Sequence, residues 1–303
     1  MIDKNELGGV LIVNKHEGYT SHDIVNKIRR LYGTKRVGHT GTLDPMATGV
    51  LVVLVGRAAK AEEYLQPGKK GYRATLRLGI TTDTEDTTGT VLTKKDSLPL
   101  PEKVIETCRE FVGKTEQVPP MYSALKVGGK KLVDIARAGG EIERKPRPIE
   151  IYSLTCEKTE KESDYTLEVS CSGGTYIRTL CADIGKKLGC GGAMASLQRT
   201  ETCGFRIEES HTVKELEELT EEERSSLLIP TESLFSDCPA VALPEFFERL
   251  CRGGCEIYQK KIGTHYDIGT RVRLCGKDGF FALGEVREYE SGTAIKAIKI
   301  FLI

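Results

Sequence analysis

The chain has 303 residues, 39% of them hydrophobic, and its 44 basic side chains balance 44 acidic ones. This length is enough for one large domain or two ordinary ones. No apolar run approaches the ~20 residues of a membrane span, and residues 1–6 lack the pattern of a secretion leader, so we expect a cytoplasmic protein with no membrane partner. Ten cysteines then favour free thiols over disulfides, and the lack of a Cys-x-x-Cys pair argues against zinc.

The first third of the chain predicts alternating strands and helices. Residues 9–14 form a short apolar run typical of a buried strand, and residues 20–21 can cap the helix that follows. A loop rich in glycine and threonine spans 38–49 and leads into an apolar strand at 50–55. Apolar and polar residues then alternate over 72–78, which is the period of a half-buried strand.

The middle of the chain continues this mixture of strands and helices. Pro101 is expected to begin a helix, because proline is favoured in the first helical turn. Strands are predicted at 149–156 and 165–171, and a helix at 177–188 that Gly189 ends. The apolar side chains expected on the inner face of the helix from Pro101 are Val104, Ile105, Cys108 and Val112.

Charge is distributed unevenly along the chain. Residues 121–148 are basic and rich in glycine, which suits a protruding arm better than a core element. Residues 201–250 carry 4 basic and 13 acidic side chains, concentrated over 215–223, where we expect a solvated helix face. The rest of the chain therefore has a surplus of positive charge, which permits a polyanionic partner without establishing one.

The last part of the chain differs in composition from the rest. From about residue 236 it reads as a small module of short strands, with alternating residues near the end at 295–300. Together with the earlier elements this predicts an α+β fold with a strand-rich appendix.

The loop at 38–49 is the densest stretch of polar residues and glycines. Its glycines allow tight turns and close approach of a ligand to the backbone. Asp44 precedes Pro45, which keeps the aspartate in extended backbone. The residues alone leave two interpretations open, an Asp-Pro turn or a loop-borne functional carboxylate. A phosphate-binding loop is excluded, because no Gly-Lys-Ser/Thr sequence follows.

Four segments in order resemble motifs of the TruB family of pseudouridine synthases. They are Gly38–Leu51, Lys70–Gly79, Gln117–Lys126 and Gly174–Leu180. Two departures occur: Asn-Lys-His stands at 14–16 where the family usually has Asp-Lys-Pro, and 194–200 lacks the family's usual histidine and first arginine. These departures affect only the residues expected in the pocket wall and in some RNA contacts.

The resemblance implies a fold and a division into domains. A central mixed, mainly antiparallel sheet flanked by helices is expected in a catalytic domain over 1–235. The basic segment 121–148 would be its thumb insertion. Residues 236–303 resemble a PUA domain, a small RNA-binding β-barrel, although a barrel without RNA contacts stays open.

The resemblance also implies a reaction and a partner. The family converts uridine 55 in the T-loop of tRNA to pseudouridine, by detaching uracil, rotating it and rejoining it through carbon. It uses no metal and no organic cofactor. The expected partner is the T-stem-loop of tRNA, bound by a monomer with no protein partner. Two alternatives stay open: a guide-RNA-dependent enzyme like dyskerin, which the thumb insertion argues against, and a non-catalytic tRNA-folding chaperone.

Individual roles follow from the same resemblance. Asp44 matches the catalytic nucleophile, which attacks either the pyrimidine ring or the anomeric carbon. Arg178 matches the arginine that pairs with it, and Tyr72 the tyrosine that stacks on the flipped base. The matches for substrate binding are His39, Tyr176, Leu197 and Lys15, and the last of these allows a purely structural role.

Overall fold

The computed structural model describes residues 8–65, 68–123 and 125–302, so the leader expectation for residues 1–6 lies outside it. The helices are α1 Ser21–Leu31, α2 Pro101–Arg109, α3 Leu132–Arg137, α4 Ile177–Lys187, α5 Val213–Glu218, α6 Glu221–Ser226, α7 Glu245–Arg252 and α8 Gln259–Ile262. Short 3-10 helices are η1 Arg57–Tyr64, η2 Ile207–Glu209 and η3 Thr231–Phe235. No helix among the described residues is long and apolar enough to cross a membrane.

Among the described residues, ten strands form one large sheet. Its main path runs in the order β14-β1-β3-β12-β4-β11-β10-β7, while β2 pairs with β3 and β13 with β12. The β1–β14 and β3–β12 pairs are parallel and the others antiparallel, which confirms the mixed, mainly antiparallel sheet. The strands are β1 Gly8–Lys15, β2 Val37–His39, β3 Thr48–Gly56, β4 Lys70–Leu78, β7 Gly113–Gln117, β10 Arg147–Lys158, β11 Asp164–Cys171, β12 Gly192–Thr202, β13 Phe205–Arg206 and β14 His211–Thr212.

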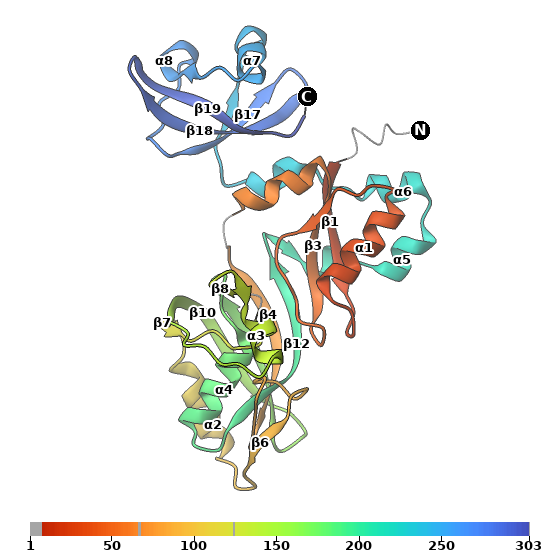
Figure 1. Ribbon diagram of the computed structural model, residues 1–303, viewed down its shortest axis with the longest axis vertical. Helices are drawn as coiled ribbons and strands as arrows, with labels where there is room; N and C mark the ends of the chain where they lie inside the picture. Colours follow the sequence, from red (N-terminus) through yellow and green to blue (C-terminus); the bar gives the residue numbers. More distant parts are fainter. Residues whose placement is uncertain (1–7, 66–67, 124, 303) are drawn as a thin grey trace.

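Helices pack on this sheet in two groups that flank β4 and β12 (Figure 1). α1 and α5 cover β1 and β3, and their apolar faces form one buried cluster with those strands. α2 and α4 lie on β4, β10, β11 and β12 and bury a second cluster. The two long strands β4 and β12 pair with each other in the middle of the sheet order. Apolar side chains of β4 and β12 belong to the second of these clusters.

Local signals explain where the helices begin and end. Thr20 caps α1, with its side chain accepting a hydrogen bond from the Asp23 amide. Pro101 stands at the first position of α2, as predicted. The expectation that Val112 points inward is wrong, because α2 ends at Arg109 and Val112 is exposed. The acidic segment forms two short helices, because Thr220 caps α6 directly after α5.

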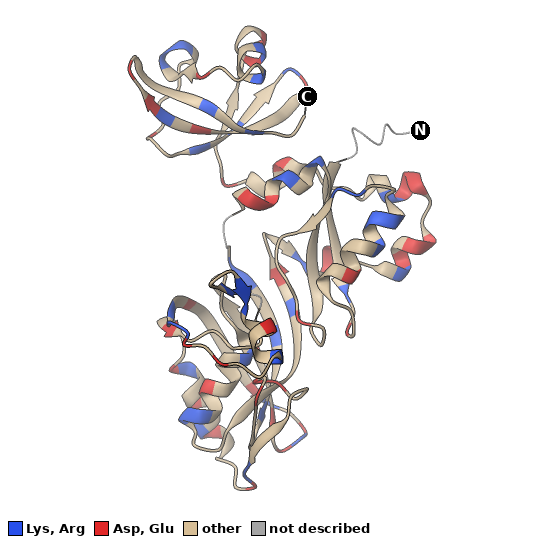
Figure 2. Cartoon of the chain, in the orientation of Figure 1, with Lys and Arg blue, Asp and Glu red and all other residues tan. Residues whose placement is uncertain are grey.

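The basic segment 121–148 was expected to form a protruding arm, and that expectation stays a prediction. It contains a small hairpin, β8 Lys126–Val127 and β9 Lys130–Lys131, followed by α3. Figure 2 shows the basic hairpin in front of the central strands, on the opposite part of the molecule from the acidic α5 and α6. In this view the basic hairpin and the acidic helices lie on different parts of the molecule.

Residues from Ala240 onwards form a second, separate sheet. It has the order β15-β17-β18-β19-β16, built from β15 Ala240–Ala242, β16 Ile257–Tyr258, β17 Arg271–Gly276, β18 Gly279–Tyr289 and β19 Gly292–Ile300. Ala61, Phe235, Phe280 and Phe301 share one buried cluster between this module and η1. The guanidinium of Arg271 also donates a hydrogen bond of 2.8 Å to the carbonyl of Tyr64. The module is therefore packed on the rest of the chain by apolar and polar contacts.

Candidate active site

The loop predicted at 38–49 is shorter in the structure than expected. Residues 37–39 form β2 and pair with β3, so the irregular segment runs from Thr40 to Ala47. Gly49 then has a φ of +97°, and a Cβ there would lie 2.2 Å from the carbonyl oxygen of Arg199. Only glycine fits this close approach of β3 to β12. The loop that carries Asp44 is thus fixed at both ends by the sheet.

Asp44 and Arg178 meet although 134 positions separate them in the sequence. Nε of Arg178 lies 3.0 Å from Oδ2 of Asp44. The arginine side chain is 6% exposed and stands in the first turn of α4, whereas the carboxylate is 38% exposed. The buried guanidinium therefore orients a carboxylate that is open to solvent.

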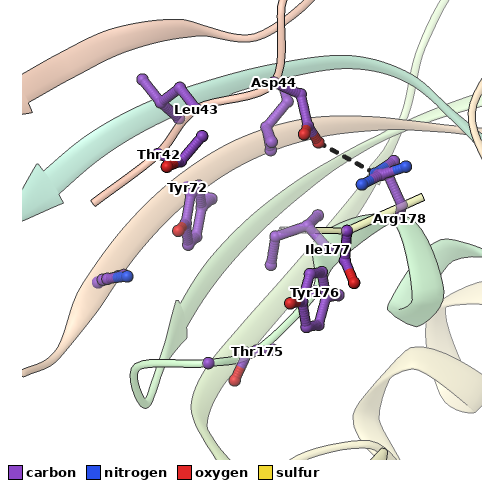
Figure 3. A pocket seen from close by; sticks show the side chains of 12 residues that line it. Thr42, Leu43, Asp44, Tyr72, Thr175, Tyr176, Ile177 and Arg178 are labelled. Atoms are coloured by element: carbon purple, nitrogen blue, oxygen red, sulfur yellow. Dashed lines mark ion pairs between the residues drawn. The ribbon is translucent and has the colours of Figure 1, made fainter. Parts of the chain in front are cut away.

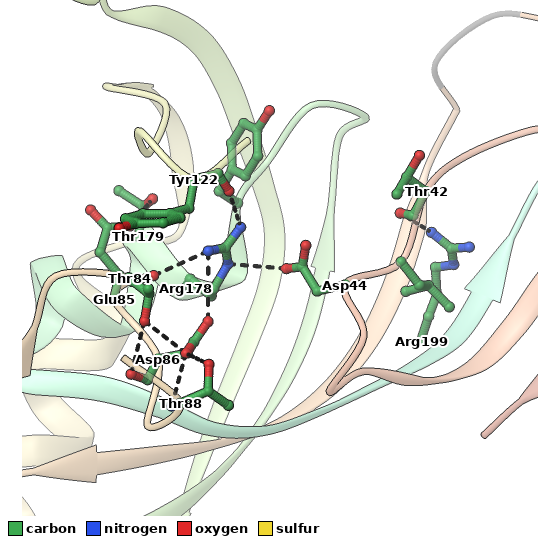
Figure 4. A network of polar contacts seen from close by, with 12 residues as sticks. Thr42, Asp44, Thr84, Glu85, Asp86, Thr88, Tyr122, Arg178, Thr179 and Arg199 are labelled. Atoms are coloured by element: carbon green, nitrogen blue, oxygen red, sulfur yellow. Dashed lines mark hydrogen bonds and ion pairs between the residues drawn. The ribbon is translucent and has the colours of Figure 1, made fainter. Parts of the chain in front are cut away.

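The Arg178 guanidinium is itself held on its other sides (Figure 4). It donates hydrogen bonds of 3.1 Å to the carbonyl of Thr84 and 2.8 Å to the carbonyl of Tyr122. A second carboxylate, that of Asp86, lies 3.6 Å away and is buried. Asp86 also accepts hydrogen bonds from Thr84 and Thr88. These contacts leave the guanidinium one orientation toward Asp44.

A pocket of about 230 Å³ opens beside this pair (Figure 3). Five of the residues predicted for the site line it: Asp44, Tyr72, Tyr176, Arg178 and Leu197. Its volume is below the roughly 300–1,000 Å³ of typical pockets for drug-sized molecules. The pocket can therefore take one base-sized group and not a folded stretch of nucleic acid.

Tyr72 lies on β4 with its ring almost fully buried at 7% exposure. Burial raises the pKa of its hydroxyl, so the phenol stays protonated throughout the neutral range. The residue opposite it on β12 is Arg199. Tyr72 thus supplies an apolar ring face and a protonated hydroxyl to the pocket.

The structure places Lys15 and His39 outside the pocket wall. Lys15 is fully buried and donates hydrogen bonds to the carbonyls of His16, Tyr19 and Pro45, so it ties β1 to the loop next to Asp44. Burial lowers the pKa of its ammonium to about 8, against a smaller opposing effect of Asp44. His39 is half-buried at the end of β2, and burial lowers its pKa as well.

Sequence reasoning missed a second buried arginine at the site, Arg199. It is 1% exposed, and its guanidinium donates hydrogen bonds to the carbonyls of Val50 (2.7 Å), Gly41 (3.0 Å) and Thr42 (3.4 Å). Arg199 therefore connects β12 to both ends of the Asp44 loop. The sequence offered one signal for Arg199, which was its place in segment 194–200. That segment was noted only for lacking the family's usual histidine and first arginine.

Replacing Arg199 by methionine is expected to lower the free energy of unfolding by about 3 kcal/mol. The reason is that buried carbonyls of Gly41 and Val50 lose their donor, at about 1–3 kcal/mol each. Urea unfolding measures the difference. Arg73→Met is the matched control, since Arg73 on β4 makes an exposed ion pair with Glu168 and should change stability by less than about 1 kcal/mol. Equal losses in the two variants would contradict the anchoring role.

Within the part of the chain that the structure describes, no group of three or more His, Cys, Asp or Glu side chains is arranged to hold a metal ion. The polar groups that line the pocket include a carboxylate, a guanidinium, an ammonium and phenols. Such a set can supply a charged nucleophile, a cation that orients it and ring faces that bind a planar group.

Comparisons with known proteins point to one family. Residues 29–177 match the model described as TruB family pseudouridylate synthase (N terminal domain), and residues 178–236 match that of the tRNA pseudouridylate synthase B C-terminal domain. The chain is similar to tRNA pseudouridine synthase B of Syntrophotalea carbinolica, at 40% identity over 97% of this chain and 98% of the relative. It is 44% identical to the protein of that name from Francisella philomiragia, over 92% and 91% of the two chains.

A solved structure shares the whole fold. It is described as the crystal structure of a Cbf5-Nop10-Gar1 complex, and it superposes with a TM-score of 0.76 at 26% identity. The match covers 100% of this chain and 87% of that one, so it includes the second sheet as well as the first. The α+β class and the strand-rich appendix expected from the sequence are thereby confirmed.

Proposed function

The chain belongs to the TruB family of pseudouridine synthases, and from this premise we propose that it converts uridine 55 in the T-loop of tRNA to pseudouridine. The relatives' name, tRNA pseudouridine synthase B, supports tRNA as the substrate. The observation that carries the proposal is the 3.0 Å pair of Asp44 and Arg178 beside a base-sized pocket. In the proposal this carboxylate is the nucleophile, and a single flipped-out base enters the pocket beside it.

In the proposed reaction Asp44 is the nucleophile and attacks either the pyrimidine ring or the anomeric carbon of the ribose. The bond from nitrogen to the ribose breaks, the base rotates, and a new bond joins the ribose to carbon. A proton leaves that carbon and the freed nitrogen gains one, so the reaction is redox-neutral. Arg178 keeps the carboxylate oriented, and its own contacts with Thr84 and Tyr122 hold it in place.

The target base must leave the RNA stack before it reaches Asp44. Unstacking costs a few kcal/mol, which contacts elsewhere on the RNA have to offset. We assign these contacts to the basic arm at 121–148 and to a PUA-like RNA-binding domain over 236–303, with the catalytic domain over 1–235. Inside the pocket, Tyr72 would stack on the base, with Tyr176 and Leu197 completing the wall. His39 would hold the RNA loop open from outside it.

The test uses the purified protein and a T-stem-loop RNA without any guide RNA or protein partner. Pseudouridine is mapped after incubation, and the same RNA with cytidine at position 55 is the control. The expected result is one pseudouridine, at position 55. Product that appears only after a guide RNA is added would favour the dyskerin-like alternative, and RNA refolding without product would favour the chaperone.

Two replacements of Tyr72 should separate stacking from the work of the hydroxyl. Phenylalanine keeps the ring, so RNA affinity should persist, while turnover should fall about a hundredfold if the hydroxyl moves a proton. Leucine should lose both affinity and turnover. Because burial raises the Tyr72 pKa, the hydroxyl stays neutral in the neutral range, and wild-type turnover should show no titration of this group between pH 7 and 9. A leucine variant with normal turnover would remove both roles.

A further inference from the structure

The pocket contains a cation that the proposed chemistry does not use, Lys70. It is the first residue of β4, half-exposed, and lines the pocket together with Asp44 and Tyr72. Among the described residues, no carboxylate lies within the 4.0 Å of an ion pair from its ammonium. The pocket's own carboxylate, Asp44, is engaged by Arg178 instead. Lys70 therefore has its charge available to a ligand.

A second cation lies beside Lys70 and strengthens the local positive field. A Cβ placed on Gly41 would lie 3.7 Å from Nζ of Lys70 and 3.7 Å from Nη1 of Arg199, so both groups flank the same glycine. Burial, and then the charge of Arg199, lowers the pKa of Lys70. Arg199 is itself buried and bonded to carbonyls, so it contributes charge but no contact surface. Two neighbouring cations, neither of which forms an ion pair with a described residue, favour the binding of an anion.

The spacing along β4 indicates which anion this is. Residues two apart in a strand lie on the same face, about 7 Å from each other, so Lys70 and Tyr72 face the same side. A nucleotide whose base stacks on Tyr72 has its phosphodiester backbone one ribose away from that base. We propose that Lys70 binds a backbone phosphate adjoining the flipped-out uridine, with the buried Arg199 behind it. This inference rests on the proposed function.

Charge removal at Lys70 gives the first measurement. Lys70→Met is expected to weaken binding of the T-stem-loop about 10- to 100-fold, as for a hydrogen bond between charged groups, and to reduce the salt slope of log K by about 0.7–0.9. Turnover at saturating RNA should change little, because the contact is made before the chemical step. The matched control is Lys69→Met, which removes the same charge from an exposed neighbour that does not line this pocket.

Charge removal on the RNA gives the second measurement, and its first step uses the wild-type protein alone. Methylphosphonate replaces one phosphodiester, either 5′ or 3′ of the target uridine, or in the stem as a control. Wild-type affinity should fall about tenfold for one of the two flanking positions. For that same RNA, Lys70→Met should cause no further loss, whereas Lys69→Met should add its own independent loss.

The outcomes are distinct from those of the proposed function. If the unmodified T-stem-loop acquires no pseudouridine with wild-type protein, the proposed function fails. The affinities of wild type and Lys70→Met for the unmodified and methylphosphonate RNAs still show whether Lys70 binds a phosphate. If pseudouridine forms but Lys70→Met and both flanking methylphosphonates add independently, the phosphate contact is overturned. If the losses of affinity from Lys70→Met and from one flanking methylphosphonate do not add, the phosphate contact is supported. The position of that methylphosphonate identifies the phosphate that Lys70 binds.

Discussion

Replacement of Asp44 by asparagine is expected to lower the single-turnover rate at least about a thousandfold, with RNA affinity within a few-fold of wild type. Asparagine keeps the shape of the side chain but removes the charge that makes the carboxylate a nucleophile. The hydrogen bonds that hold Arg178 to Thr84 and Tyr122 do not involve Asp44, so the guanidinium should stay in place. The chemical step is therefore lost without collapse of the pocket.

Release of tritium from uracil labelled at carbon 5 measures this rate directly, because that carbon loses its proton when it joins the ribose. Asp96→Asn is the matched control, since Asp96 is 95% exposed and should leave the rate unchanged. Substantial tritium release by the Asp44 variant would remove the aspartate from its proposed role.

Much of the fold follows from the sequence because its signals are local. Alternation over 72–78 predicted a strand with Tyr72, Ala74, Leu76 and Leu78 on the buried side, and the structure confirms all four. The start of α2 at Pro101 and the start of α1 next to Thr20 were predicted for the same reason. The prediction for Val112 was wrong because the apolar spacing continues beyond Arg109, where the helix ends and the chain leads into β7.

The candidate site was only partly accessible to such reasoning. Residue types and spacing left Asp44 open between a turn and a functional carboxylate, and its role came from a resemblance. Arg178 carried an overlooked signal of its own. A cation in the first turn of a helix opposes the helix dipole, and α4 has no acidic residue there to compensate. Such an arrangement persists where carboxylates from other elements, here Asp44 and Asp86, supply the missing charge.

Residue patterns could not show what Lys15 and Arg199 bind, because the partners of both are backbone carbonyls. Lys15 and Arg199 donate to main-chain oxygens at Pro45, Gly41 and Val50, and the sequence encodes no side chain that marks those positions. Their burial depends on how β1, β3 and β12 come together, which is tertiary information. The sequence therefore identifies the loop but does not show which contacts hold it in place.

Methionine at Arg178 is expected to lower both turnover and stability. Turnover should fall between about a hundredfold and a thousandfold, because Asp44 loses the cation that orients it. The free energy of unfolding should fall by about 3–5 kcal/mol, because the Asp86 carboxylate is only 6% exposed and loses its cationic partner. Single-turnover kinetics and urea unfolding measure the two effects. Arg178→Lys keeps the charge but not the planar fork, so it should recover part of the stability and little of the rate.

A double variant separates the two causes. Adding Asp86→Asn to Arg178→Met removes the uncompensated buried charge, so it should restore part of the lost stability while the rate stays low. Asp86→Asn alone should destabilise, since Arg178 then loses one of its two carboxylate partners. Additive stability losses in the double variant would show that Asp86 and Arg178 do not interact. Recovery of turnover along with stability would mean that Arg178 supports the fold and not the orientation of Asp44. Recovery of stability alone is the outcome expected if the 3.0 Å contact with Asp44 serves the reaction.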